Sequence, residues 1–195
     1  MKICVFMSSS DAVAQHYVDV ALELGRAIGE NGHTLVFGGN NTGLMGRLAD
    51  AVKDAGGTVI GVVPQKLDDL GRSYTRCDKL IISKDLRDRK GIMDEHAEAF
   101  VAIPGGLGTL EEIIEVLNLK YLRYHQKPVI FLNHRGFYDP IFTAFETFYE
   151  QRFTKKAVEK LYPSLPTVEA IFPYLKNYVP IQVEEKWYDR STDAI

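Results

Sequence analysis

The chain has 195 residues, a length that fits one domain, or one domain with a small appendage. Hydrophobic residues make up 46% of it and charged residues 25%, which is the composition of an ordinary globular protein with a full core. The formal net charge of −3 argues against a general electrostatic attraction to nucleic acid or to an anionic membrane, so any anion site must come from local geometry.

The sequence carries no recognisable metal, disulfide or targeting pattern. Cys4 and Cys77 have neither a CxxC nor a CxxH neighbour, and the five histidines show no HxxxH or HxH spacing. We therefore expect no metal and no cofactor. The N-terminal apolar run is too short for a signal peptide or a membrane span, and no later run is long enough, so we expect a cytoplasmic protein.

Short apolar runs alternate with longer segments of helical periodicity along the chain. The pattern predicts strands over residues 3–7, 34–37, 59–63, 79–82, 99–103 and 129–132. It predicts helices over residues 12–30, 44–55, 86–95, 110–124, 138–151 and 168–178, with Gly91 as a weak point in the third of these.

Continuous apolar strands joined by crossover helices predict an α/β fold, a Rossmann-like, doubly wound and mostly parallel sheet with helices on both faces. Residues 1–178 are expected to form a single nucleotide-binding domain. The remaining residues, 179–195, show no clear period and are expected to form a tail that is loose or docked on a partner.

Ligands of such sheets bind beyond the carboxyl ends of the strands, near the switch in strand order. Four polar or glycine-rich segments fall at these ends: SSSD (8–11), GGNNTGLMG (38–46), DLRDRK (85–90) and PGGLGTLEE (104–112). From the first two segments we expect the ligand to be contacted by Ser8, Ser9, Gly38, Gly39, Gly43 and Met45.

The GGNNTGLMG segment allows two interpretations. Its glycines permit close backbone approach to an anion, with a helix N-terminus behind them. It is not a dinucleotide fingerprint, which should follow the first strand, and it lacks the Gly-Lys-Ser/Thr of a P-loop. The same glycines also suit a strand-to-helix turn that needs positive φ, and the sequence leaves both interpretations open.

The PGGLGTLEE segment also allows two interpretations. Thr109 and Glu112 fit a capping box, in which each side chain satisfies a backbone N–H of the first helical turn. A cap needs none of the three preceding glycines, however. Alternatively, the backbone and hydroxyl groups from Gly105 to Thr109 hold a phosphate, while Glu112 activates water or stabilises positive charge on a sugar ring.

The DLRDRK segment places Arg87, Arg89 and Lys90 beside two aspartates. Such a group is usually a solvated helix start with local ion pairs. On the expected ligand edge of a slightly acidic protein, Arg89 could instead make a bidentate contact with a phosphate or carboxylate.

At these residues the sequence resembles the Lonely-guy family of cytokinin-activating phosphoribohydrolases, often mislabelled lysine decarboxylase. The resemblance rests on the PGGxGTxxE motif (104–112), the upstream pair Arg89-Lys90, the GGxxxGLMG loop (38–46) and the segment 127–141. It runs from residue 2 to about residue 174. It implies that Arg89 and Glu112 are catalytic. It also implies a nucleotide site lined by Lys90, Gly106, Leu107, Gly108, Thr109, Leu110, Glu111 and Asn118.

The implied reaction is hydrolysis of the N-glycosidic bond of a nucleoside 5′-monophosphate, a cytokinin riboside monophosphate or AMP, to free base and ribose 5-phosphate. The resemblance also implies a homodimer with the active site near its interface. From the net charge we expect no nucleic-acid polymer or membrane as partner. Leu107 stands where tyrosine is frequent in the family, Arg87 where histidine is frequent, and Asn118 where threonine is frequent. These departures leave the preferred base open.

Two other functions remain as alternatives. A non-catalytic carrier of a nucleotide or phosphorylated cofactor, like the molybdenum cofactor carriers, would bind its ligand without turnover. A pyridoxal-phosphate decarboxylase would need a Schiff-base lysine and an aspartate partner for the pyridine ring. Lys90 is the only lysine in a motif, and nothing in the sequence marks it for that role.

Overall fold

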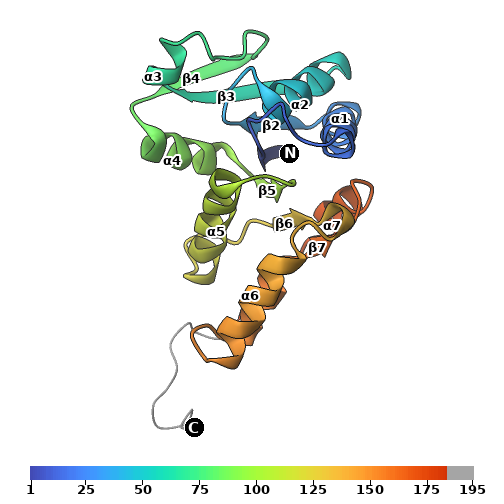
Figure 1. The fold of residues 1–195 in the computed structure, drawn as a ribbon, viewed down its shortest axis with the longest axis vertical. Helices are drawn as coiled ribbons and strands as arrows, with labels where there is room; N and C mark the ends of the chain where they lie inside the picture. The colour runs from blue at the N-terminus through green and yellow to red at the C-terminus, as the bar shows by residue number, and fades with distance from the viewer. Residues whose placement is uncertain (184–195) are drawn as a thin grey trace.

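The computed structural model describes residues 1–183 and contains one seven-stranded sheet with helices on both faces (Figure 1). The strand order is β4-β3-β2-β1-β5-β6-β7, and every neighbouring pair is parallel. The predicted doubly wound α/β fold is confirmed. The strands are β1 (Lys2–Phe6), β2 (Thr34–Phe37), β3 (Thr58–Pro64), β4 (Lys79–Ser83), β5 (Ala99–Ala102), β6 (Val129–Leu132) and β7 (Ser164–Leu165).

Two buried clusters lie on the two faces of the sheet. Ile3 and Val5 of β1 pack in the cluster that includes α1 (Gln15–Glu30) and α2 (Gly43–Asp54). Cys4 and Phe6 pack in the opposite cluster with α4 (Leu86–His96) and α5 (Leu107–Tyr121). Because successive residues of a strand point to opposite faces, a strand covered on both sides must be apolar throughout.

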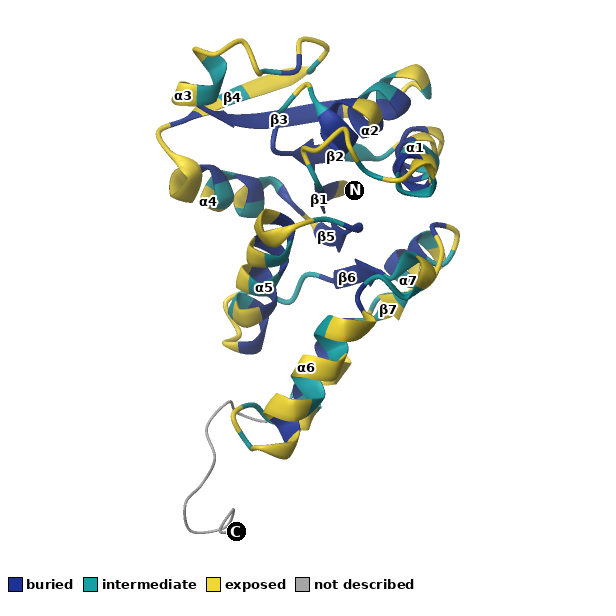
Figure 2. Cartoon of the chain, in the orientation of Figure 1, coloured by how far each residue is buried: buried dark blue, intermediate teal, exposed yellow. Residues whose placement is uncertain are grey.

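The rest of the chain surrounds this frame. Its helices are α3 (Gln65–Asp68), α6 (Asp139–Glu150), α7 (Ile171–Lys176) and the 3₁₀ helices η1 (His134–Gly136) and η2 (Lys156–Leu161). Figure 2 shows that the central strands are buried whereas β4, at one edge, is largely exposed. Within residues 1–183, no helix has both the length and the apolar character that a membrane crossing requires.

Several boundaries differ from the predictions. The last strand, β7, and the short helices α3, η1 and η2 were not predicted. Gly91 lies inside α4 without ending it, and α1 begins at Gln15. Of the predicted tail, residues 184–195 lie outside the described part of the chain.

The topology creates one crevice. The chain leaves β1 for β2 on one side and later adds β5 on the other, so the switch in strand order lies between β1 and β5. Segments that follow β1, β2 and β5 therefore meet at the carboxyl edge of the sheet, where doubly wound folds bind ligands.

Candidate active site

A cavity of about 250 Å³ lies at this switch point. Its lining comes from the segment after β1, from the helices α2 and α4, and from the start of α5: Met7, Ser8, Ser9, Met45, Arg89, Gly106, Gly108, Thr109 and Glu112. All of these except Met7 were predicted site residues. Met7 was missed because an apolar residue at a strand end looks like core from sequence alone.

Arg89 and Glu112 form a buried ion pair in this cavity. The Nη2 of Arg89 donates to Oε1 of Glu112 at 2.6 Å, and the two residues are only 7% and 8% exposed. The Nε of Arg89 also donates to the Sδ of Met93 at 3.4 Å. A solvated helix start is therefore the wrong description for Arg89. Two of its five N–H groups are used, and the other three have no acceptor within residues 1–183.

Glu112 titrates differently from a surface glutamate. Burial raises its pKa, and the positive charge of Arg89 offsets part of that increase. The net result is a pKa above the ordinary glutamate value. A carboxyl group with a raised pKa is better suited to taking up and returning a proton than a surface glutamate is, because its pKa is closer to neutral pH.

The capping-box interpretation of Thr109 and Glu112 is wrong. Helix α5 begins at Leu107 with Gly106 as its N-cap, and no side chain caps it. Thr109 therefore lies in the first turn, and Glu112 lies in the second, where its carboxylate contacts Arg89. The first turn contains no acidic residue, so no carboxylate competes with a ligand for its N–H groups.

The N-terminus of α5 is open toward the cavity. Gly106 and Gly108 have no positive φ, and a Cβ atom at either position would meet no atom within 4 Å. The packing of the described chain therefore does not require glycine at these two positions. Within residues 1–183, the N–H groups of residues 107–109 have no side-chain acceptor. Free N–H groups at a helix N-terminus, with the helix dipole behind them, form an anion site.

The loop between β2 and α2 is satisfied by the protein itself. Oδ1 of Asp11 accepts from the N–H of Gly43 at 3.1 Å, and Oδ1 of Asn40 accepts from the N–H of Thr42 at 3.0 Å. Gly39 and Gly43 have φ of +66° and +64°, so this loop is the positive-φ turn that the sequence left open. Neither glycine lines the cavity, whereas Met45, in the first turn of α2, does so.

A groove of about 590 Å³ runs along α4 and α5. It is lined by the predicted residues Lys90, Leu107, Leu110, Glu111 and Asn118, together with Ile114 and Glu115. The Nζ of Lys90 pairs with Glu111, and with Oε2 of Glu115 at 2.6 Å. Glu115 was not predicted, although it lies one helical turn after Glu111. Gly105 lies next to the Thr109 side chain and lines neither the groove nor the cavity.

Lys90 is held as a cation. Burial lowers its pKa, but the hydrogen bonds to Glu111 and Glu115 outweigh burial and leave the pKa above the ordinary lysine value. A Schiff-base lysine must instead be neutral to attack a carbonyl group. The geometry around Lys90 thus argues against the pyridoxal-phosphate alternative.

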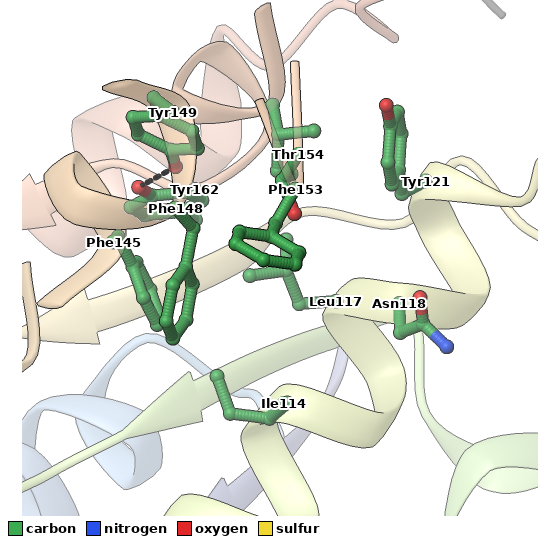
Figure 3. A pocket seen from close by; sticks show the side chains of 11 residues that line it. Ile114, Leu117, Asn118, Tyr121, Phe145, Phe148, Tyr149, Phe153, Thr154 and Tyr162 are labelled. Atoms are coloured by element: carbon green, nitrogen blue, oxygen red, sulfur yellow. Dashed lines mark hydrogen bonds between the residues drawn. The ribbon is translucent and has the colours of Figure 1, made fainter. Parts of the chain in front are cut away.

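A third pocket, of about 270 Å³, lies beside the groove (Figure 3). It is mostly aromatic, and Ile114 and Asn118 line both the groove and this pocket. Side chains of α5 face those of α6 and the segment after it, and Tyr149 and Tyr162 share a hydrogen bond of 2.6 Å at its edge. Phe153 lines the pocket and is 81% exposed.

Sequence comparison decides the family of the chain. The family model described as "Possible lysine decarboxylase" matches residues 45–175. The chain is 35% identical over 196 residues to cytokinin riboside 5′-monophosphate phosphoribohydrolase LOG2 of Arabidopsis thaliana, covering 99% of this chain and 92% of that protein. It is 37% identical over 190 residues to the LOG enzyme of Oryza sativa subsp. japonica, covering 97% and 78%. The chain belongs to the Lonely-guy family.

Solved structures place this Lonely-guy protein near a second group. The molybdenum cofactor carrier protein of Chlamydomonas reinhardtii superimposes with a TM-score of 0.69 at 25% identity, covering 90% of this chain and 95% of that one. A cofactor-binding protein from Rippkaea orientalis matches with a TM-score of 0.68 at 24% identity, which shows the shared fold alone. The fold therefore does not choose between an enzyme and a carrier, and the site residues must do so.

Proposed function

We propose that this protein hydrolyses the N-glycosidic bond of a nucleoside 5′-monophosphate, a cytokinin riboside monophosphate or AMP, to the free base and ribose 5-phosphate. One observation carries the proposal: a buried Arg89–Glu112 pair lines the same cavity as the uncapped N-terminus of α5. The cavity thus combines an anion site with an acid–base group. The curated relatives named above carry this activity in their names.

The 5′-phosphate binds at the start of α5. The N–H groups of residues 107–109 lie at this end of the helix, and Thr109, whose hydroxyl lies against Gly105, lines the cavity. The positive end of the helix dipole adds to their attraction for a phosphate. Because Gly106 and Gly108 lack side chains, the phosphate can approach the backbone closely. We place the phosphate here and not on the loop after β2, because the N–H groups of Thr42 and Gly43 already donate to side chains of the protein.

The ribose then lies against Arg89 and Glu112. The bond from C1′ to the base nitrogen breaks as the base leaves, and C1′ gains positive charge that the carboxylate of Glu112 stabilises. A water oxygen bonds to C1′, and one of its protons passes through Glu112 toward the departing base. Arg89 fixes the carboxylate and directs its unused N–H groups to the substrate.

A panel of nucleoside 5′-monophosphates tests the proposal. Each is incubated with the protein, and free base and ribose 5-phosphate are separated by chromatography and quantified. We expect equimolar release of both products from at least one member, and little release from the matching nucleoside, which lacks the phosphate. Absence of base release from every member would contradict the proposal.

The carrier function is the second candidate, because the Chlamydomonas carrier protein shares this fold. A carrier would hold its ligand and return it unchanged. Equilibrium dialysis against AMP, followed by analysis of the recovered ligand, separates the two candidates. Intact AMP bound with micromolar or tighter affinity would support the carrier, whereas adenine in the dialysate would support the hydrolase.

We further infer that the protein acts as a cytoplasmic homodimer whose interface lies near the active site. Leu107 is 87% exposed and borders the groove, and Phe153 is 81% exposed and borders the aromatic pocket next to it. Large apolar side chains exposed in one region are typical of an interaction surface. Sedimentation of the wild type and of Phe153→Asp tests this inference, with a dimer expected only for the wild type.

A further inference from the structure

Arg89 is held in place by three different parts of the fold. Its Nη2 contacts Glu112 of α5, its Nε contacts Met93 one turn further along α4, and its guanidinium lies against Gly38, directly after β2. The first two contacts attract the side chain. The third is a contact with a residue that has no side chain.

Gly38 is unlike Gly39 and Gly43, the two positive-φ glycines of its loop. Its backbone lies outside the left-handed region, so no dihedral angle requires glycine. A Cβ atom at position 38 would lie 2.5 Å from Nη2 and 2.9 Å from Cζ of Arg89, closer than any side-chain carbon is tolerated. The other near neighbour, Cε of Met45 at 3.4 Å, would be in ordinary contact.

We infer that Gly38 is a positioning residue: its missing side chain is the space that lets the Arg89 guanidinium reach Glu112. The inference rests on the proposed function for its catalytic consequence. It gives Gly38 a role different from the ligand contact that the sequence predicts for it, because the atoms against it belong to Arg89.

The expected damage from a methyl group at position 38 is local. The atoms in its way are the far end of a long side chain, so the guanidinium moves and the backbone does not need to. At Gly39 the obstruction is Val63 in the neighbouring strand β3, and at Gly43 it is the backbone of residues 9 and 10. Gly38→Ala therefore displaces Arg89 selectively. A displacement of about 1 Å in a catalytic site can cost about 10²-fold in rate.

A double-mutant cycle tests the inference. The wild type, Gly38→Ala, Arg89→Ala and the double variant are compared in base release and in urea-induced unfolding. We expect Gly38→Ala to slow base release at least tenfold in the wild-type background, and to change it less than about twofold in the Arg89→Ala background. Gly91→Ala serves as control, because it is on the same helix as Arg89 and a Cβ there meets nothing within 4 Å.

The pH profile gives a readout that general destabilisation would not move. Arg89 lowers the pKa of Glu112, so a displaced guanidinium lets that pKa rise. The acid limb of kcat/KM should move to higher pH in Gly38→Ala and stay unchanged in Gly91→Ala. An equal fold-loss in both Arg89 backgrounds, or wild-type rates and an unmoved acid limb in Gly38→Ala, would overturn the inference.

The urea-unfolding measurements test the contact between Gly38 and Arg89 even if the proposed function is wrong. If the wild type releases no base from any substrate, the urea midpoints still decide: Gly38→Ala must lower the midpoint when Arg89 is present and leave it unchanged when residue 89 is alanine. If Gly38→Ala does not fold, recovery of folding in the double variant supports the inference, and failure of both variants contradicts it.

Discussion

The two glycine-rich loops of this protein, residues 38–46 and 104–109, look alike in sequence and serve different needs. In the first loop, Gly39 and Gly43 have positive φ and lie against other parts of the protein, and side chains of Asn40 and Asp11 accept its N–H groups. In the second loop, Gly106 and Gly108 need no special dihedral angle and face open space.

The two loops differ in whether the fold itself requires their glycines. Where a Cβ would collide with the protein, the fold itself explains the residue. Where a Cβ would meet nothing and φ is ordinary, glycine costs helix stability without a structural need for it. Gly106 and Gly108 also line the cavity, whereas Gly91 of α4 does not, so close approach of a ligand can explain the first two glycines. By this criterion, we propose that the first loop shapes the site and that the second loop binds the substrate.

Removing Glu112, the proposed acid–base group beside the second loop, should have the largest effect. Glu112→Gln keeps the size of the side chain and a hydrogen-bond acceptor for Arg89, but it cannot become an anion. We expect kcat for base release to fall about 10²–10⁴-fold, equivalent to about 3–5 kcal/mol of transition-state stabilisation. The rate is measured chromatographically under saturating substrate.

Glu146→Gln is the matched control for this variant, because Glu146 lies on α6, does not line the cavity and pairs with Lys156 at 3.2 Å. Its rate should equal that of the wild type. A Glu112→Gln protein that retains full activity would show that the second loop carries no acid–base chemistry, whatever it binds.

The first loop should respond to substitution in stability and not in binding. In Gly43→Ala, the new methyl group would overlap the backbone of Ser9, and the residue would keep a φ of +64° that alanine disfavours. We expect the free energy of unfolding to fall by about 3 kcal/mol. Urea denaturation followed by circular dichroism measures the loss, and an unchanged midpoint would show that this loop is not fixed by its contacts.

The fold could be predicted closely because its signal is distributed along the chain. The central strands are largely apolar, since helices cover both faces of the sheet there, and the six predicted strands end within one residue of those observed, while helix ends differ by up to three residues. The elements that were missed are short. The two residues of β7 and the four of α3 are too few to establish a period, and their placement comes from neighbours distant in sequence.

The site could be predicted as a neighbourhood but not as a set of contacts. Segments at the carboxyl ends of parallel strands must share one edge, so Ser8, Arg89 and Thr109 were expected together. The pairing of Arg89 with Glu112 depends on how α4 and α5 are rotated, which no local pattern records. The capping-box prediction was wrong because Thr-x-x-Glu reads the same when the helix begins two residues before its threonine.

Gly108→Ala should give the opposite signs to Gly43→Ala. In the first turn of α5, with ordinary φ and open space, alanine should raise the free energy of unfolding by about 0.5–1 kcal/mol. The same methyl group occupies the proposed phosphate position, so we expect the dissociation constant for AMP to rise about tenfold. Calorimetry measures the binding in the Glu112→Gln background, where AMP turnover is slow, with Gly91→Ala as a stabilised variant that should bind normally.

Stronger stability with unchanged AMP binding in Gly108→Ala would break the comparison, because the open glycines would then have no ligand to explain them. Weaker AMP binding by Gly43→Ala, at temperatures where this variant is fully folded, would also contradict the distinction between the loops. The first loop would then contact the phosphate as well.

The smallest expected effect is a pH dependence with opposite signs for stability and activity. Burial raises the pKa of Glu112 above the ordinary value of 4.5, so the folded state binds its proton more tightly than the unfolded state does. The stability that this group contributes is full below pH 4.5 and is lost as the pH rises through the raised folded-state pKa, by about 1.4 kcal/mol for each tenfold difference in proton affinity. Relative to Glu112→Gln, the wild type should therefore lose stability as the pH rises through this window.

Over the same pH window kcat/KM of the wild type should rise, because the proposed hydrolysis requires the carboxylate. Urea midpoints and initial rates measured at matched pH values test both signs. A wild type that gained stability relative to Glu112→Gln as the carboxylate ionised would mean that Arg89 outweighs burial, and the acid–base group beside the second loop would then be an ordinary ion pair.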